Sequence, residues 1–336
     1  MESLAIFFTG PQTVELRKLP VPDPGPGEVL VRTTKTLIST GTECIAYAHL
    51  IEPGTNWERM VQYPWAAGYS HAGVVEAVGE GVADLRPGDR VASFHRHSQY
   101  AWGPAEGFLP VPEGVTDEAG AFYALTTVVQ NAIRKAEHEL GDTVVVVGLG
   151  LLGQLVVQYV RLMGAREVVA VDLSEGRLMV AAEHGATATL CMGADAAREP
   201  LADLTGGRLA DVVYDVTGNP EVFAPAQRLA RRFGRLVLLG DTGTPSQQRL
   251  VNDFLWRGLR IIGAFSGDPP PDETDHHFWT RRNMARLFFD YVRRGQMRVS
   301  DLITHRFRPQ EAAEVYRMLL HDRGATVGVV FDWTQV

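Results

Sequence analysis

Three glycines that follow a run of valines are the first residues of this sequence with an evident chemical use. Gly148, Gly150 and Gly153 have the spacing G-x-G-x-x-G, between the valines of 144–147 and a segment, 154–163, with helical periodicity. The first glycine then permits a tight turn, the second lets backbone approach a pyrophosphate, and the third lets the helix pack closely on the strand. The helix amino terminus offers N–H groups and a positive dipole end to phosphates. The pattern predicts a dinucleotide-binding site, and a glycine-rich turn in another kind of α/β unit is the alternative.

An acidic residue at the end of the next predicted strand, 167–171, refines this prediction. Asp172 lies roughly 20 positions beyond the glycines, where a carboxylate can accept hydrogen bonds from the adenosine ribose. The same carboxylate would repel a 2′-phosphate. Asp172, followed by Leu173, therefore favours NAD(H) over NADP(H) as the cofactor.

Composition limits the kind of protein that positions these residues. The 336 residues allow two domains, and 45% hydrophobic with 21% charged residues is typical of a globular protein. A net charge of −8 argues against nucleic acid or an anionic membrane as partner. No apolar run approaches about 18 residues and the first residues lack a basic segment, which predicts a cytoplasmic protein without a membrane span. Two cysteines, Cys44 and Cys191, cannot form a four-cysteine zinc site, and we expect them to be buried, inert thiols.

The chain changes rhythm near residue 125. Up to about residue 120, short apolar runs bounded by Gly or Pro predict a compact, barrel-like β domain. Beyond it, strands and amphipathic helices alternate, which predicts a doubly wound parallel sheet and an α/β fold. The strands are predicted at 144–147, 167–171, 211–216, 235–240 and 259–265. A long helix is predicted at 280–294, and a helix and a last strand within 299–333.

This order of parts and several short motifs resemble the medium-chain dehydrogenase/reductase family, whose zinc-type members are alcohol and polyol dehydrogenases. The matching motifs are PGPGEVLVR at 24–32, GTE at 41–43, GYSHAG at 68–73, VG at 78–79, PGDRV at 87–91, the glycine turn, and SDLITHRF at 300–307. The resemblance implies a GroES-like catalytic domain from 1–124 and 275–336 and a Rossmann domain from 125–274. It also implies a homodimer, or a tetramer, through a sheet edge at 260–265.

The zinc ligands of that family are missing from this sequence. Zinc-dependent members place Cys before Gly-Thr-Asp/Glu, His in a Gly-His-Glu motif, and Cys or Glu just before the Rossmann unit. The corresponding positions here are Thr40, then Tyr69 and Ser70, and then Tyr123 or Ala124. Zinc prefers thiolate, imidazole or carboxylate ligands in a tetrahedral set, so the sequence predicts a zinc-free protein. A relocated site that uses His71, His95 or His97 is the alternative.

Without zinc, a side chain must move the proton of the reacting alcohol or ketone. The resemblance suggests Thr42 from the family's proton relay, Tyr69 at the lost histidine, His95 in the substrate pocket and Tyr123 beside the third lost ligand. Each has a structural alternative: a helix cap for Thr42, a space-filling aromatic for Tyr69, a bond to backbone for His95 and a core position for Tyr123. Glu43 either orients the site or caps a helix. His97 matches a position that is often structural.

The resemblance also extends the set of residues expected to contact the cofactor. Arg177 matches a position against the adenosine ribose, Thr127 a hydroxyl near the nicotinamide, and Leu152 a side chain behind its ring. Other expected contacts come from the glycine turn and from loops that follow later strands: Leu149, Leu151, Thr217, Gly218, Leu239, Gly240, Asp241, Ala264 and Phe265.

These expectations combine into one leading hypothesis and two rivals. The leading hypothesis is a zinc-independent, NAD-dependent dehydrogenase that acts on a secondary alcohol or ketone, such as a polyol or sugar. The GYS motif resembles that of sugar- or chlorophyllide-type alcohol dehydrogenases, which is an analogy rather than a mechanism. The rivals are a zinc-free, NADPH-dependent enone or quinone reductase, and a non-catalytic protein that senses a dinucleotide.

Overall fold

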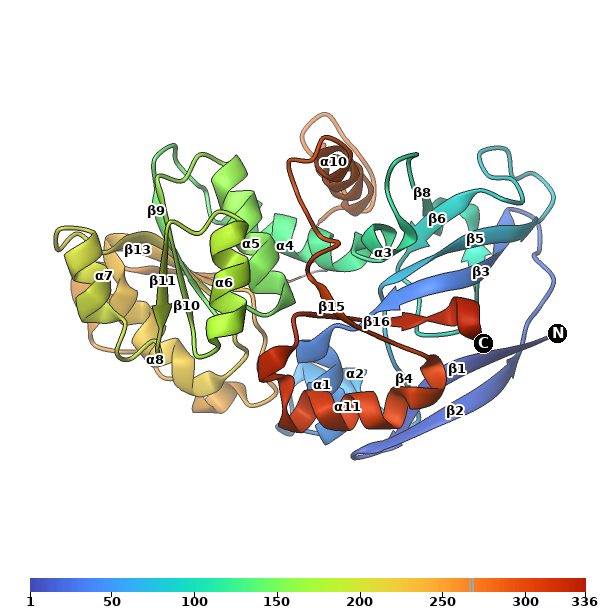
Figure 1. Cartoon of the computed structure of the whole chain (residues 1–336), viewed down its shortest axis with the longest axis horizontal. Helices are drawn as coiled ribbons and strands as arrows, with labels where there is room; N and C mark the ends of the chain where they lie inside the picture. The colour runs from blue at the N-terminus through green and yellow to red at the C-terminus, as the bar shows by residue number, and fades with distance from the viewer. Residues whose placement is uncertain (266, 268) are drawn as a thin grey trace. The chain divides into compact units, whose positions relative to one another are not determined.

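The computed structural model describes residues 1–265, 267 and 269–336 (Figure 1). The chain divides into two compact units: unit 1 is Met1–Thr126 with Pro271–Val336, and unit 2 is Thr127–Pro270. The corresponding sequence-based segments were 1–124 with 275–336, and 125–274. Within the described residues, no helix has both the length and the apolar character needed to cross a membrane.

Unit 2 is built on a six-stranded sheet with the order β11-β10-β9-β12-β13-β14, and every neighbouring pair is parallel. Its strands are β9 (Thr143–Val147), β10 (Glu167–Asp172), β11 (Ala188–Cys191), β12 (Ala210–Asp215), β13 (Ala230–Leu238) and β14 (Arg260–Gly263). All five residues of β9 are buried, as a parallel strand covered on both faces requires. The α/β class predicted for this part of the chain is confirmed.

Helices cover this sheet and complete its core. They are α4 (Tyr123–Lys135), which spans the boundary between the units, α5 (Leu151–Leu162), α6 (Glu175–Glu183), α7 (Arg198–Leu204), α8 (Pro220–Leu229) and α9 (Asp253–Arg257). In Figure 1, α5 and α6 lie beside the strands that they contact, β9 and β10 for α5 and β10 and β11 for α6. Val145 and Val147 pack with Phe223 and Leu229 of α8 in one buried cluster.

The sequence missed some of these elements. Neither β11 nor α7 was predicted, and β13 begins at Ala230 rather than at 235. The first residues of β13, Ala-Arg-Arg-Phe-Gly, include partly and fully exposed side chains, so they lack the apolar run that marks its later, buried part. Strand β14 ends at Gly263, two residues before the predicted end.

Unit 1 holds two further sheets. A seven-stranded sheet has the order β15-β16-β3-β5-β6-β8, with β7 also paired to β3, and a three-stranded sheet has the order β2-β1-β4. The strands are β1 (Glu2–Gly10), β2 (Thr13–Pro20), β3 (Glu28–Leu37), β4 (Trp65–Ala66), β5 (His71–Val78), β6 (Arg90–Ser93), β7 (Tyr100–Pro104), β8 (Phe108–Pro110), β15 (Ile303–Phe307) and β16 (Gly328–Asp332). Because β16 pairs with β3, the two ends of the chain form one unit, as the GroES-like prediction requires.

The helices of unit 1 bring aromatic residues of distant segments together. They are α1 (Thr40–Ala48), α2 (Asn56–Met60), α3 (Asp117–Gly120), α10 (Arg281–Arg293) and α11 (Ala312–His321). Short 3-10 turns lie at Ala105–Gly107, Pro309–Glu311, Arg323–Ala325 and Trp333–Gln335, and another in unit 2 at Pro245–Gln247. Phe8 and Tyr316 meet edge to face with ring centroids 4.7 Å apart, inside a core that also includes Tyr47 and Phe331. This core holds α11 against the amino-terminal strands.

Candidate active site

The glycine turn of unit 2 has the geometry that its spacing predicts. Gly148 has a φ of 92°, in the left-handed region that favours glycine. A Cβ atom on Gly153 would lie 2.0 Å from the carbonyl oxygen of Gly148, so no side chain fits where α5 approaches the turn. Gly150 is the N-cap of α5, and the following residues, Leu151 and Leu152, begin the helix. The turn therefore presents the first backbone N–H groups of a twelve-residue helix, an arrangement that suits a phosphate group.

Asp172, at the end of β10, is bonded to this same turn. One carboxylate oxygen accepts the N–H of Leu149 at 2.6 Å, and the other accepts the N–H of Ser174 at 2.8 Å. The Arg177 guanidinium lies 4.0 Å from the carboxylate, and the Leu173 side chain is exposed. A carboxylate has about four acceptor positions, so Asp172 keeps capacity for ribose hydroxyls while it fixes the turn.

The loop that follows β12 meets both the glycine turn and the loop that follows β13. A Cβ on Gly148 would contact the Thr217 side chain at 2.9 Å, and one on Gly218 would lie 2.5 Å from the carbonyl of Asp241. The N–H groups of Leu239 and Gly240 both donate to the backbone carbonyl of Asp215, whose carboxylate accepts from Thr217. These loop residues are thus brought together at the carboxyl end of the sheet, where open parallel sheets bind ligands.

Three remaining cofactor predictions, Ala264, Phe265 and Thr127, lie outside the glycine turn and these two loops. Ala264 follows β14 and donates its N–H to the carbonyl of Leu238. The backbone carbonyl of Phe265 accepts from the Asn131 amide at 2.8 Å, while its ring is 70% exposed. Thr127 is buried in α4, at the start of unit 2. The structure places these residues without testing their contact with a cofactor.

In unit 1, Tyr69 belongs to a small group of hydroxyls. Its phenol donates to the Ser39 hydroxyl oxygen at 2.6 Å, and Ser39 donates in turn to the Thr42 hydroxyl oxygen at 3.4 Å. Burial raises the pKa of Tyr69, although hydrogen bonds with Ser39 and Thr42 partly oppose the rise. The phenol is therefore protonated at neutral pH and is a proton donor. The structure brings together two predicted candidates, Tyr69 and Thr42, through a serine that the sequence analysis did not identify.

Glu43 is bonded to the backbone of Ser39, in the hydroxyl group around Tyr69, and is fully buried. Its carboxylate accepts the Ser39 N–H at 2.7 Å, lies 3.0 Å from Nε2 of His97, and accepts the phenol of Tyr316. A Cβ on Gly68 would lie 2.5 Å from the His97 ring, so the glycine before Tyr69 makes room for this pair. Glu43 thus holds the Ser39 backbone at the start of α1, as its helix-cap alternative predicts, and its contacts leave it enclosed.

His95 is part of a separate chain of hydrogen bonds. Its Nε2 atom lies 3.3 Å from the Trp102 carbonyl, which can only accept, so Nε2 carries the proton and Nδ1 accepts from the Ser93 hydroxyl at 2.9 Å. The Ser93 oxygen then accepts from Nδ1 of His71 at 2.8 Å, and Nε2 of His71 accepts from Thr33 at 3.1 Å. The bond from His95 to the Trp102 carbonyl is the structural alternative predicted for His95, a hydrogen bond to backbone.

We expect this histidine chain to make unit 1 sensitive to acid. Burial is the main cause that lowers the pKa of His71 well below its usual range, and burial also lowers the pKa of His95. Unfolded histidines titrate near pH 6.5, so below that value the unfolded chain binds more protons than the folded chain. Stability present above about pH 6.5 is then lost as the pH falls, by about 1 kcal/mol per histidine for each pH unit.

Urea denaturation between pH 7.5 and pH 5 measures this effect. The urea midpoint is expected to fall with pH below about 6.5, and less steeply in His71→Asn. A surface variant, His321→Asn, serves as the control because His321 is exposed. A midpoint that stays constant over this range would show that the two buried histidines do not titrate as proposed.

Tyr123 lies in an aromatic group rather than in the hydroxyl group. Its ring meets Phe94 edge to face at 5.2 Å, Phe94 is stacked with Tyr69 at 6.4 Å, and the Arg281 guanidinium lies 5.4 Å from the Phe94 centroid. Burial raises the pKa of Tyr123, and the nearby Arg282 and Arg281 oppose the rise. Phe94 and Arg281 carry no sequence motif, and only the fold places them here.

The positions of the family's zinc ligands hold side chains with other partners. The Ser70 hydroxyl donates to the Ala121 carbonyl at 2.6 Å, and Tyr69 donates to Ser39. Cys44 is buried on α1, where desolvation raises its thiol pKa to about 12. The expectation of burial is wrong for Cys191, which is exposed at the end of β11. In the part of the chain that the structure describes, no three His, Cys, Asp or Glu residues are grouped so that they could hold a metal ion.

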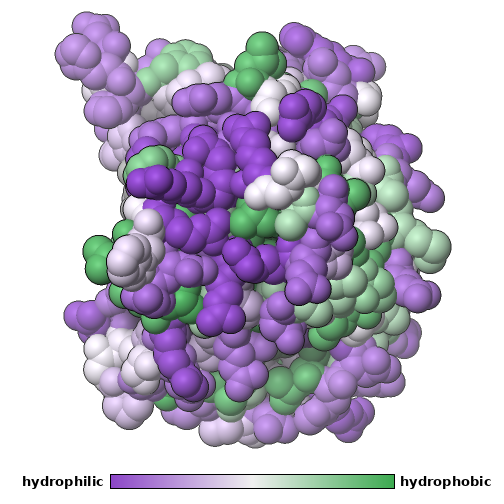
Figure 2. All heavy atoms as spheres, turned by 90° about the vertical axis from the view of Figure 1, so that its left-hand side faces the viewer, coloured by the Kyte–Doolittle hydropathy of each residue, from purple (hydrophilic) through white to green (hydrophobic). Residues whose placement is uncertain are grey.

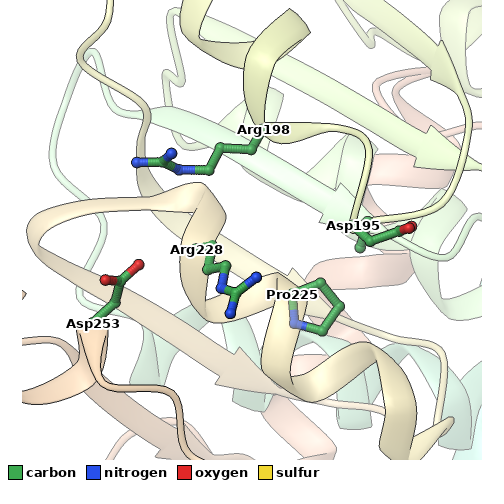
Figure 3. Close-up of a pocket in the computed structure, with 6 residues that line it drawn as sticks. Asp195, Arg198, Pro225, Arg228 and Asp253 are labelled. Carbon is green, nitrogen blue, oxygen red and sulfur yellow. The ribbon is translucent and has the colours of Figure 1, made fainter.

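A hollow in unit 2 lies outside these groups. It has a volume of about 370 Å³ and is lined by Ala194, Asp195, Arg198, Pro225, Arg228 and Asp253 (Figure 3). Hydrophilic side chains gather on much of the face that carries α7 (Figure 2). Two guanidinium groups and two carboxylates balance in charge, so the lining does not favour an ion of either sign. None of the predicted cofactor or acid/base residues lines this hollow.

A doubly wound parallel sheet with a glycine turn, joined in one chain to a β domain, defines a two-domain dehydrogenase fold. The chain matches the family models described as "Alcohol dehydrogenase GroES-like domain" at residues 25–138 and "Zinc-binding dehydrogenase" at residues 152–279. It is 30% identical to sorbitol dehydrogenase of Macaca fascicularis, over 98% of this chain and 96% of that protein. The chain therefore belongs to the medium-chain dehydrogenase/reductase family of zinc-type alcohol dehydrogenase-like proteins, and it is an oxidoreductase of the alcohol dehydrogenase type.

Solved structures with low sequence identity share the same fold. A zinc-binding dehydrogenase of Sinorhizobium meliloti 1021, solved with NADP, has a TM-score of 0.80 at 24% identity and is covered over 99% of both chains. An alcohol dehydrogenase of Escherichia coli CFT073, solved with NADH, has a TM-score of 0.80 at 23% identity, over 98% of this chain and 99% of that one. Both similarities confirm the predicted two-domain α/β fold.

Proposed function

We propose that this protein is a zinc-independent, NAD-dependent dehydrogenase that transfers hydride between the nicotinamide and a secondary alcohol or ketone. The observation that carries the proposal is the hydroxyl group around Tyr69, which occupies the place of a zinc ligand in the family and presents a protonated phenol. A polyol or sugar is the substrate class that we favour, because the sorbitol dehydrogenase relative acts on such a compound.

The residues at the ligand positions do not suit zinc. Tyr69, Ser70 and Thr40 offer neutral hydroxyls, and Tyr69 and Ser70 are engaged with other protein atoms. Zinc sites in proteins use thiolate, imidazole or carboxylate groups. We therefore route no step of the reaction through a metal ion.

A nicotinamide dinucleotide supplies or accepts the hydride when it is bound. The glycine turn and the amino terminus of α5 suit its pyrophosphate, and the Asp172 carboxylate suits a ribose with a free 2′-hydroxyl. In the reductive direction, Tyr69 gives a proton to the oxygen that becomes the alcohol. In the oxidative direction the same oxygen returns its proton to the phenolate. We propose that the other residues expected to contact the cofactor also do so: Leu151, Leu152, Leu173, Arg177, Thr127, Thr217, Gly218, Leu239, Gly240, Asp241, Ala264 and Phe265.

A substrate panel tests the proposal directly. Secondary alcohols, sugars, ketones and enones are followed at the nicotinamide absorbance with NAD(H) and NADP(H), before and after dialysis against a chelator. The expected result is turnover of an alcohol–ketone pair with NAD(H) that the chelator leaves unchanged. Turnover of enones alone with NADPH would favour the reductase, and tight NADH binding without any turnover would favour the sensor. About one zinc per chain, lost together with activity, would overturn the metal-free mechanism.

We also propose that the protein forms a homodimer, or a tetramer, through the edge of the unit 2 sheet at 260–265. Strand β14 pairs with β13 on one side only among the described strands, and edge strands with open backbone groups favour pairing. Leu255 and Trp256 of the adjacent α9 are 78% and 76% exposed, which adds apolar surface.

Sedimentation velocity tests the dimer. We expect a species of at least twice the 36.9 kDa chain mass, and a monomer for Ile262→Lys on β14. Met179→Lys on α6 is the matched control, since Met179 is an exposed apolar residue away from β14. A wild-type monomer at micromolar concentration would contradict the proposal.

A further inference from the structure

Ser39 has an unusual role for a serine at the start of a helix. It occupies the N-cap position of α1, where a serine side chain ordinarily accepts a backbone N–H of the first turn. Its hydroxyl makes no such bond. The hydroxyl instead lies between the Tyr69 phenol, at 2.6 Å, and the Thr42 hydroxyl, at 3.4 Å.

The backbone of Ser39 is held in place by a different group. The Glu43 carboxylate accepts the Ser39 N–H at 2.7 Å, and His97 and Tyr316 fix that carboxylate from two other segments. Glu43 thus fixes the position of Ser39, whose hydroxyl accepts no N–H of the first turn and is bonded to the two other hydroxyls instead. Ser39 is only 6% exposed, whereas Thr42 is half-buried, so a buried hydroxyl connects the phenol to a side chain that reaches the surface of unit 1.

We propose that Ser39 is a proton-relay residue that connects Tyr69 to Thr42, a proposal that rests on the function proposed above. When Tyr69 gives its proton to the substrate oxygen, the O–H bond of Ser39 breaks as its proton moves to the Tyr69 oxygen. Ser39 then takes the Thr42 proton, and Thr42 takes one from water. Each oxygen ends with the proton count it began with, and one proton passes from solvent to product. In alcohol oxidation the protons move in the opposite direction.

The arrangement is specific to hydroxyl side chains. Each member must both accept and donate a hydrogen bond, which serine, threonine and tyrosine hydroxyls can do. Alanine at position 39 would remove the hydroxyl to which the phenol donates at 2.6 Å and so interrupt the relay through Ser39. Threonine would keep a hydroxyl at the same branch point.

Steady-state kinetics of Ser39→Ala tests the relay on the substrate that the panel identifies. We expect kcat to fall about 10- to 100-fold with KM within about twofold, and the solvent deuterium isotope effect on kcat to increase. Small buffer acids are expected to restore part of the lost rate, a rescue that a merely structural defect would not give. Ser39→Thr is expected to remain within about threefold of the wild type. Ser98→Ala is the matched control. It likewise removes a buried serine hydroxyl, but one that donates to the Tyr100 carbonyl rather than to another hydroxyl.

Thr42→Val interrupts the chain one step farther out and serves if Ser39→Ala does not fold. It is expected to show the same rise in isotope effect and the same buffer rescue. Wild-type kcat and isotope effect in either folded variant, in an enzyme that loses its rate with Tyr69→Phe, would overturn the relay while the proposed function stands. Absence of dehydrogenase activity in the wild type would instead reject the proposed function, and the relay with it.

Discussion

Tyr69→Phe is expected to lower kcat for ketone reduction by about 10²- to 10⁴-fold, with KM within about threefold. The substitution removes the phenol that donates to Ser39 but keeps the ring that is stacked with Phe94. One lost hydrogen bond changes the free energy of unfolding by only about 1 kcal/mol, so the folded enzyme can be assayed. Steady-state rates with the panel substrate, and a melting curve for each variant, supply the measurement.

Two further phenylalanine variants make this result specific. Tyr63→Phe removes a comparable phenol, which donates to the Ala46 carbonyl at 2.6 Å, and is expected to retain wild-type kcat. Tyr123→Phe tests whether Tyr123, the other candidate tyrosine, is the proton donor instead of Tyr69. If the rate fell with Tyr123→Phe and not with Tyr69→Phe, the acid would be assigned to Tyr123.

The pH profile supplies a second measurement on the same residue. Burial raises the pKa of Tyr69 above its ordinary value of 10.0, so the phenol stays protonated across the neutral range. The rate of ketone reduction is therefore expected to be independent of the Tyr69 ionisation up to about pH 10, and to fall above it. Alcohol oxidation needs the phenolate, so its rate is expected to rise with pH over the same range. A reduction rate that fell between pH 6 and pH 8 would indicate a different acid.

Asp172→Ser has the second large effect, on the choice of cofactor. We expect kcat/KM with NADH to fall about 10- to 100-fold, because hydrogen bonds from a ribose to a charged acceptor contribute about 1.5–3 kcal/mol. We expect kcat/KM with NADPH to rise, because the substitution removes the carboxylate that repels a 2′-phosphate and lies 4.0 Å from Arg177. The measured quantity is the ratio of the two kcat/KM values.

Asp172 has two roles, and the amide variant separates them. Asp172→Asn keeps an oxygen that can accept the N–H of Leu149, so the glycine turn is preserved while the charge is lost. It is expected to lie between the wild type and Asp172→Ser in NADH affinity and to relax the discrimination against NADPH. An unchanged NADH/NADPH ratio in both variants would contradict a ribose role for Asp172.

The features that the sequence predicts well are local ones. The valines of β9, the three glycines and the helix α5 are consecutive, so their roles depend on neighbours that can be recognised without knowing the fold. Asp172 follows from the same logic, since it lies one strand farther on. The structure adds that its carboxylate is bonded to Leu149 within the turn.

The acid/base group could not be predicted in the same way. Tyr69 and Ser39 are 30 positions apart, and Glu43 and Tyr316 are 273 positions apart. Serine before a helix is typical of a cap, and the sequence analysis did not identify Ser39; only the tertiary structure shows where its hydroxyl is directed. His95 illustrates the opposite case, because a histidine suited to proton transfer is bonded to the Trp102 carbonyl.

The contact between Glu43 and Tyr316 has a consequence for the newly synthesised chain. Unit 2 is complete in sequence at Pro270, well before Tyr316 leaves the ribosome. Domains generally fold as units during synthesis, so the dinucleotide-binding unit can form while Glu43 still lacks one of its three partners. The carboxylate that fixes Ser39 is seated only when the last segment of the chain has docked. During its own translation, the protein can therefore complete its proposed cofactor site before it completes the hydroxyl group that we propose moves the proton.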